Sequence, residues 1–137
     1  MSEFNDRVIA EFRENGGRVD TGDFGTSLVL IHSVGARSGA ERVNPAMSLT
    51  DGPDRLVIAS AAGARANPGW YHNLVAHPDI TIETPDGVEQ VTAVELDGEG
   101  YAAAWRRFDA TAPAFGRYQR RARSRRLPIF RLRLRAR

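Results

Sequence analysis

The chain has 137 residues, no cysteine, and 19 basic residues against 17 acidic ones. All 19 basic residues are arginine; residues 1–100 have a net charge of −9, whereas residues 101–137 have a net charge of +11. This length predicts one domain spanning residues 1–137, and a hydrophobic fraction of 42% supports a packed core. The absence of cysteine excludes disulfides, thiolate nucleophiles and cysteine-ligated zinc or iron–sulfur sites.

Targeting signals are not evident in the sequence. The N-terminal segment is charged throughout and lacks the apolar stretch of a signal peptide. The longest unbroken apolar run, residues 101–105, is far shorter than the roughly 20 residues that span a bilayer. We therefore predict a cytoplasmic protein without a transmembrane segment.

The first half of the chain predicts one helix followed by strands. Apolar residues at helical spacing predict a helix over residues 1–17, capped by Ser2 and ended by two glycines. Residues 26–34 are rich in apolar and β-branched side chains, which indicates a buried strand. Strands over 41–50 and 55–61 follow, joined by a turn at 51–54, and Pro45 places the first of them at a sheet edge or bulge.

The second half mixes helices and strands. Asn67 and Pro68 predict a helix start, with Asn67 as cap and Pro68 at the first helical position, and His77-Pro78 ends that helix. A hairpin is predicted over 79–84 and 88–96, followed by helices over 98–110 and 113–126. Residues 101–126 thus form a basic helical segment. An alternation of apolar residues with arginines from Phe130 onward predicts a last strand with one buried face.

Hairpin-linked strands with helices at the start, middle and end indicate an α+β fold. About six mostly antiparallel strands joined by short turns predict a small β-barrel with flanking helices.

Motifs for covalent or metal chemistry are absent. The three histidines lie in no zinc-binding pattern; His32 is expected to be a core or barrel-facing residue, and His72 and His77 to lie at the surface. We therefore predict no metal site. If the protein is an enzyme, a cofactor supplies the difficult step.

Three short segments predict a ligand site. Arg37, Ser38 and Arg42 surround a glycine-bounded turn that suits a phosphate or carboxylate. Small residues over 59–63 end a strand and permit close approach of a flat ring. The helix start at 67–71 offers free N–H groups and aromatic walls. Taken singly, each segment is equally well explained as an ordinary turn, a small loop or a core helix.

The arginine-rich segment near the C-terminus has several interpretations. A dense patch of arginines suits nucleic acid, an anionic membrane surface, the rim of a site for a polyanionic cofactor, or simple solvation. No base-reading motif accompanies it, so nucleic acid is not expected. Peripheral contact of this patch with a membrane surface is retained as an alternative. The patch consists of Arg117, Arg120, Arg121, Arg123, Arg125 and Arg126.

The order of the blocks GARSGAERVNP, LVIASAAGARANPGWYHNLVAHPDITIE and PAFGRYQRRARSRRLPIF resembles the deazaflavin-dependent nitroreductase family, of the F420H2-dependent quinone or enone reductase type. The resemblance covers about residues 28–130. It implies a split β-barrel related to FMN-binding barrels of the pyridoxamine-phosphate-oxidase type. It also implies coenzyme F420 as cofactor, the reduced form being the hydride donor.

The resemblance also implies which residues form the site. Ser60 and Tyr118 are the candidate catalytic residues. Arg37, Ser38 and Arg42 are implied to bind the cofactor tail. The remaining implied cofactor-binding residues are Val43, Asn44, Pro45, Met47, Ile58, Ala59, Ser60, Ala61, Gly69, Trp70, Tyr71 and Asn73.

The predicted function is hydride transfer from reduced F420 to a small electron-poor acceptor, which is a quinone, an enone or a nitro compound. Only Tyr118 supplies a phenol in the C-terminal segment that shapes the substrate pocket in relatives, which favours quinones and enones over nitroimidazoles. The alternatives are an FMN-dependent oxidoreductase on the same barrel and a non-catalytic F420-binding protein. Both a monomer and a homodimer are compatible with the sequence.

Overall fold

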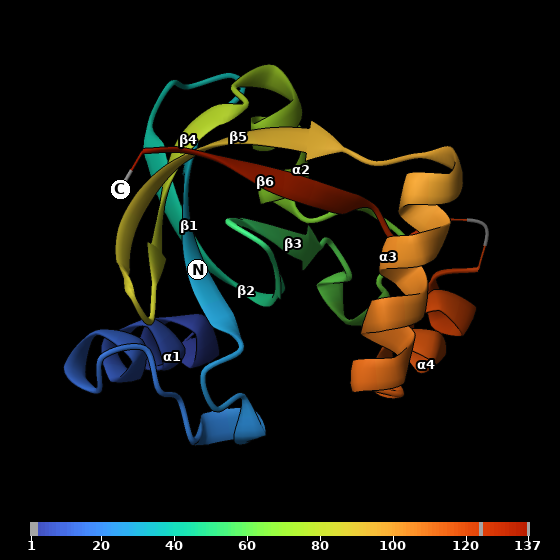
Figure 1. Cartoon of the computed structure of the whole chain (residues 1–137), viewed down its shortest axis with the longest axis horizontal. Helices are drawn as coiled ribbons and strands as arrows, with labels where there is room; N and C mark the ends of the chain where they lie inside the picture. The colour runs from blue at the N-terminus through green and yellow to red at the C-terminus, as the bar shows by residue number, and fades with distance from the viewer. Residues whose placement is uncertain (1–2, 124, 137) are drawn as a thin grey trace.

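The computed structural model describes residues 3–123 and 125–136. Six strands form a closed, entirely antiparallel barrel in the order β1-β2-β3-β6-β5-β4 (Figure 1). The predicted α+β barrel of six strands is therefore confirmed. The strands are β1 (Leu28–Val34), β2 (Glu41–Asp51), β3 (Asp54–Ile58), β4 (Asp79–Thr84), β5 (Gly87–Glu95) and β6 (Ile129–Ala136).

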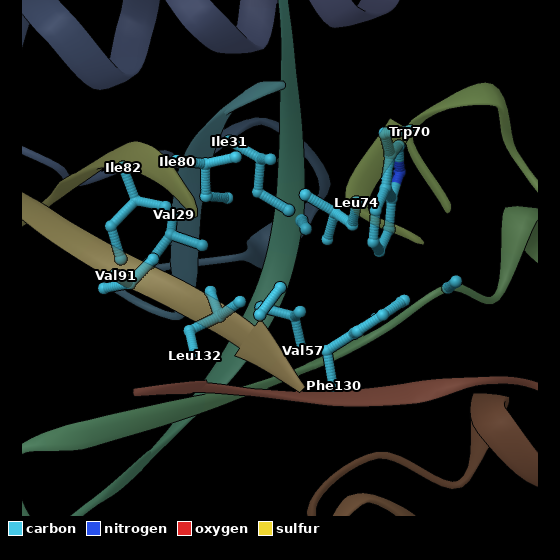
Figure 2. Close-up of a cluster of buried hydrophobic side chains, with 13 residues drawn as sticks. Val29, Ile31, Val57, Trp70, Leu74, Ile80, Ile82, Val91, Phe130 and Leu132 are labelled. Atoms are coloured by element: carbon cyan, nitrogen blue, oxygen red, sulfur yellow. The ribbon is translucent and has the colours of Figure 1, made fainter. Parts of the chain in front are cut away.

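The barrel interior is a single apolar cluster. Side chains alternate along each strand, so Val29 and Ile31 of β1 point inward together with Val57 of β3 and Leu132 of β6. Figure 2 shows these strand side chains in one cluster, with Trp70 and Leu74 of α2 at one side of it. Burying each large aliphatic side chain contributes roughly 1.5–3 kcal/mol, so this cluster is a main source of stability.

Helices cover the outer faces and one end of the barrel. On the outer face of β1, Leu28 and Leu30 pack against Val8 and Phe12 of α1, so both faces of this strand are buried, which explains its continuous apolar run. Phe108 of α3 and Phe115 of α4 pack over β3 and β6. Figure 1 shows α1 and the α3–α4 pair on opposite sides of the barrel. The helices are α1 (Glu3–Glu14), α2 (Gly69–Ala76), α3 (Gly98–Thr111) and α4 (Ala114–Ala122), with short 3-10 turns η1 (Thr21–Asp23) and η2 (Ala61–Gly63).

Part of β2 is hydrogen-bonded on one side only. Residues 41–47 pair with β1, whereas the pairing with β3 begins at Ser48, opposite Val57. Pro45, which has no N–H to donate, lies in this singly paired stretch, as its chemistry predicts. Beyond this point the chain that follows β3 no longer pairs with β2, so this part of the seam between β2 and β3 is unpaired although the barrel is closed.

Several predicted boundaries are wrong. The strand predicted over 55–61 ends at Ile58, because Ala61 takes a positive φ of 46° and begins η2. Helix α2 begins at Gly69; Pro68 is the extended N-cap residue, and Asn67 does not cap the helix. The basic segment predicted over 101–126 does contain the two expected helices, but the second, predicted over 113–126, ends at Ala122. The predicted Ser2 cap lies outside the described residues.

Candidate functional site

A cavity of about 840 Å³ lies along the seam between β2 and the segment that follows β3. Its floor comes from the singly paired stretch of β2, one wall from α1 and η1, and the opposite wall from α4. The predicted site residues that line it are Asn44, Pro45, Met47, Ile58, Ser60, Ala61, Trp70 and Tyr118. Two of the three segments predicted from separate signals, residues 59–63 and 67–71, therefore line one cavity, together with the stretch of β2 that follows the third.

The remaining predicted site residues do not line this cavity. Tyr71 packs against Phe130 at the barrel end, and its hydroxyl donates to Glu95 at 3.0 Å. Burial, reinforced by this hydrogen bond, raises the pKa of Tyr71. The Tyr71 hydroxyl is therefore bonded to Glu95 and is not directed at the cavity. The other predicted residues outside the cavity lining are Arg37, Ser38, Arg42, Val43, Ala59, Gly69 and Asn73.

Three neutral polar side chains of the cavity lining are available to a ligand, and the exposed carboxylate of Asp23 also lines the cavity. Within the described part of the chain, the amide of Asn44 and the hydroxyls of Ser60 and Tyr118 have no hydrogen-bond partner in the protein. In contrast, the Tyr101 hydroxyl donates to the Leu127 carbonyl at 2.7 Å. Of the three tyrosines, Tyr118 is therefore the one with an uncommitted hydroxyl at the cavity.

The turn between β1 and β2 is held to α2 by Asn73. The Asn73 side chain accepts a hydrogen bond from the Ala36 backbone N–H at 3.0 Å and donates one to the buried Ser33 hydroxyl at 3.0 Å. The Ser38 hydroxyl accepts from the Ala40 N–H at 3.1 Å, within the same turn. Asn73 and Ser38 thus shape the turn, a role that the sequence alone does not distinguish from ligand binding.

The two arginines at this turn are exposed. Neither Arg37 nor Arg42 forms an ion pair with any residue that the structure describes. Arg42 is opposite Ser33 and faces the same side of β2 as Asn44, two residues further along the strand, which is a separation of roughly 7 Å. A ligand whose ring occupies the cavity can therefore reach Arg42 with an anionic extension.

The cavity wall over residues 59–67 is held by Arg125, which the sequence places only within a general basic patch. Its guanidinium donates to the carbonyls of Ala59 at 3.1 Å, Ser60 at 2.8 Å and Ala64 at 2.8 Å, and to the Asn67 side chain at 2.6 Å. Burial lowers the pKa of Arg125.

Sequence reasoning missed the walls contributed by other elements. Phe4 and Val8 of α1, Phe24 after η1, and Ala112 and Phe115 near α4 all line the cavity. These are ordinary apolar residues of amphipathic helices and loops, so no local signal separates a cavity wall from core packing.

His32 does not face the barrel interior as expected. It projects from the outer face of β1 between two carboxylates, with Nε2 2.6 Å from Glu83 and Nδ1 3.2 Å from Glu41. Arg13 of α1 donates to the same Glu83 at 2.7 Å. This cluster connects α1 to the barrel. In the described residues, no group of three or more His, Asp or Glu side chains is arranged to hold a metal ion.

A second, smaller cavity of about 250 Å³ lies where the β2–β3 and β4–β5 turns meet. Its lining includes the buried Arg55 and Glu89 and no predicted site residue.

The antiparallel barrel of this chain is also found in known proteins. A Listeria innocua protein assigned as a pyridoxamine 5′-phosphate oxidase has the same fold, with a TM-score of 0.52 over 96% of this chain and 94% of that chain at 10% identity. The predicted relation to such barrels is confirmed at the level of fold.

Residues 6–133 match the model of the F420H(2)-dependent quinone reductase family, and the chain belongs to this family. An F420H(2)-dependent quinone reductase of Mycobacterium tuberculosis is 35% identical over 104 residues, which cover 74% of this chain and 69% of the relative. The structure of an F420-H2 dependent reductase is 31% identical, with a TM-score of 0.70 over 77% of this chain and 93% of that chain. The predicted family, enzyme class and cofactor are confirmed at the level of the family.

A further solved structure, described as a domain-swapped dimer, is 29% identical with a TM-score of 0.72, over 93% of this chain and 96% of that chain. Across the described residues, no helix has the length and apolar character needed to cross a membrane.

The cavity fits the ring portion of coenzyme F420. Its volume lies within the range of roughly 300–1,000 Å³ that is usual for cofactor sites. Its lining combines apolar walls with the three uncommitted polar groups of Asn44, Ser60 and Tyr118, the pattern that fixes the orientation of a ring. The exposed Arg37 and Arg42 suit the anionic tail.

Proposed function

We propose that this protein transfers a hydride from reduced coenzyme F420 to a quinone or enone, with nitro compounds as weaker acceptors. The observation that carries the proposal is the meeting of Asn44, Ser60 and Tyr118 at one cavity in a chain of this family. When bound, reduced F420 supplies the hydride.

The apolar lining of the cavity orients the reactants and excludes water. Pro45, Met47, Ile58 and Trp70 provide flat or aliphatic surfaces on different elements. Holding the two reactants in contact lowers the entropic part of the activation free energy of the reaction. Exclusion of water strengthens each hydrogen bond in the cavity.

The polar groups of the lining stabilise charge. The Ser60 hydroxyl and the Asn44 amide can each donate to an oxygen on which negative charge develops. Tyr118 holds a proton on its hydroxyl oxygen and can donate it to the reduced acceptor. Because their positions are fixed by β2, the segment after β3 and α4, these donors need little reorganisation.

The exposure of Arg37 and Arg42, and the lack of ion pairs between them and the described residues, support a tail-binding role for both. Arg42→Ala should weaken binding of intact F420 much more than binding of a ring fragment that lacks the tail. Equal losses for the two ligands would contradict the assignment. Arg106→Ala, which removes an exposed arginine of α3, is the matched control.

The decisive experiment combines binding with turnover. The purified protein is titrated with oxidised and reduced F420 and with FMN, and oxidation of bound reduced F420 is followed after addition of menadione, an enone or a nitroimidazole. We expect F420 binding and rapid oxidation by menadione. Preferential FMN binding would support an FMN-dependent oxidoreductase instead, and F420 binding without oxidation would support a non-catalytic binding protein.

A further inference from the structure

Arg125 differs from the ion-paired arginines of the chain in what it binds. Arg13, Arg55, Arg107, Arg131 and Arg135 each contact at least one carboxylate. Arg125 has no carboxylate partner among the described residues, and it donates instead to three backbone carbonyls and one side-chain amide. A charged donor committed to four neutral acceptors in one short segment fixes the shape of that segment.

The segment that Arg125 binds is the part of the chain that leaves the barrel. Ile58 is the last residue of β3, and residues 59–67 then separate from β2 along the cavity. The first backbone group after the strand is still held by the barrel, since the Ala59 N–H donates to Pro128 at 2.8 Å. Beyond it, Arg125 replaces the strand pairing that the segment has lost.

The backbone of this segment is not in a relaxed conformation. Ala61 has a φ of 46°, in the left-handed region that is unfavourable for a residue with a Cβ. Such a conformation persists where surrounding contacts over-determine it. The hydrogen bonds from Arg125 to Ala59 and Ser60 are contacts of this kind.

The same hydrogen bonds orient the peptide groups beside the cavity. No described peptide bond is cis, and in a trans peptide the N–H points opposite to the carbonyl. Because the Ala59 and Ser60 carbonyls turn toward Arg125, the N–H groups of Ser60 and Ala61 turn away from it. Ser60 and Ala61 are also the residues of this segment that line the cavity.

We propose that Arg125 is a positioning residue for the cofactor site: its guanidinium sets the conformation in which Ser60 and Ala61 meet the bound ring. The inference rests on the proposed function for the identity of the ligand, but not for the support of the segment itself. Arg125 follows shortly after α4. It thereby connects the helix that carries Tyr118 to the cavity wall that carries Ser60.

The test uses Arg125→Met, which keeps much of the aliphatic stem and removes the four hydrogen bonds, with Arg106→Met as the matched control. In the cofactor-free protein, hydrogen exchange of the backbone N–H groups over 59–67 should accelerate at least tenfold in the Arg125→Met variant, while the barrel strands exchange as before. F420 affinity should fall about tenfold or more. Arg106→Met should change neither measurement.

A chemical rescue separates positioning from general stability. In Arg125→Ala, methylguanidinium at millimolar concentration should restore part of the F420 affinity and slow the exchange over 59–67, whereas methylammonium, which lacks the planar fork, should not. Asn67→Ala, which removes one of the four acceptors, should give a smaller loss than Arg125→Met.

The inference is overturned if exchange over 59–67 in Arg125→Met equals that of the wild type, or if exchange rises evenly through all strands. Unchanged F420 affinity in Arg125→Met would overturn it as well. If the wild type binds no F420, the proposed function fails, and the exchange measurement on the cofactor-free protein still decides whether Arg125 supports the segment.

Discussion

At Gly63 the chain passes so close to α4 that no side chain fits. Its φ is +80°, and a Cβ at this position would lie 2.7 Å from the Tyr118 carbonyl oxygen and 3.0 Å from the Arg121 Cβ. The contact is with helix backbone, which cannot give way as a flexible side chain does. Gly63 therefore sets the distance between the segment after β3 and the helix that carries Tyr118.

Gly63→Ala should lower the free energy of unfolding by about 2 kcal/mol, through the positive φ and the steric overlap together. Urea unfolding measures the effect, and F420 titration should show weakened binding in the same variant. Gly100→Ala is the control, because that helical glycine has open space around its missing Cβ and no positive φ. It should stabilise the protein by about 0.5–1 kcal/mol. A Gly63→Ala protein as stable as the wild type would refute the close approach.

Tyr118 and Tyr101 provide a matched pair of phenols. Tyr118→Phe removes a hydroxyl that has no hydrogen-bond partner among the described residues, so stability should stay within about 0.5 kcal/mol while turnover with menadione falls about tenfold or more. Tyr101→Phe removes a hydrogen bond to the Leu127 carbonyl, so stability should fall by about 1 kcal/mol with turnover unchanged. Thermal unfolding and steady-state rates test both. The reverse pattern would show that Tyr118 has a structural role.

The sequence does not distinguish the side chains that line the cavity from those that only support its walls. The motif that contains Asn73, Trp70 and Tyr71 was predicted as one binding unit, yet Trp70 lines the cavity while Asn73 and Tyr71 bond to other parts of the protein. Neighbours on a helix point about 100° apart, so one motif serves several purposes. Arg125 was one arginine among six in a patch, and its partners lie 58 to 66 positions away.

At the scale of elements, the position of α1 depends on a charged cluster at its C-terminal end. Arg13 and His32 both contact Glu83, and His32 also contacts Glu41. The hydrogen bond from Arg13 lowers the pKa of Glu83, His32 adds to this effect, and burial opposes it. Since α1 also supplies Phe4 and Val8 to the cavity wall, this cluster connects the helix that borders the site to the barrel.

The lowered pKa of Glu83 determines how the cluster responds to acid. A carboxylate with a folded-state pKa below its ordinary value of 4.5 contributes stability above that value and loses it as the pH falls through the folded-state pKa. Glu83→Gln should therefore destabilise the protein by about 1 kcal/mol near neutral pH, and the difference from the wild type should shrink below about pH 4.

Urea midpoints of both proteins across this pH range provide the measurement. Glu14→Gln is the control, because Glu14, the last residue of α1, is exposed and forms no ion pair with a described residue. A difference between wild type and Glu83→Gln that stays constant down to acid pH would contradict the ionised Glu83.

The types of the helices and strands were predictable from the sequence, whereas their end residues and the contacts between them were not. The alternation after Phe130 and the helical spacing around Val8 and Phe12 fixed the correct types, because burial on one face leaves a periodic pattern. The strand end at Ile58 precedes the positive φ of Ala61, and the helix end at Ala122 precedes the positive φ of Arg123; neither residue is a glycine that would have marked the position. The cavity depends on pairing of β2 with β3 over only four residue pairs, which no local pattern encodes.

At the scale of the whole molecule, the basic charge of the last 37 residues is divided between two uses. Arg107, Arg131 and Arg135 form ion pairs with acids from earlier strands, and thereby join the two oppositely charged parts of the sequence. The arginines on the outer face of α4, by contrast, stay exposed; these are Arg117, Arg120 and Arg121. The strong positive net charge of this region is therefore in part an internal requirement of the fold.

The exposed arginines of the turn between β1 and β2 predict how salt acts on cofactor binding. If exposed arginines such as Arg42 hold the anionic tail, added sodium chloride should screen that attraction and weaken the binding of intact F420 several-fold between low and physiological ionic strength. The ring fragment without a tail, held by the walls of the cavity, should bind with nearly the same affinity across this range. Arg42→Ala should reduce the salt dependence for the intact cofactor, and Arg106→Ala should leave it unchanged. Fluorescence titration with both ligands at each salt concentration provides the comparison. Equal salt dependence for the two ligands would place the charge recognition on the ring rather than the tail, and would remove Arg42 from the site.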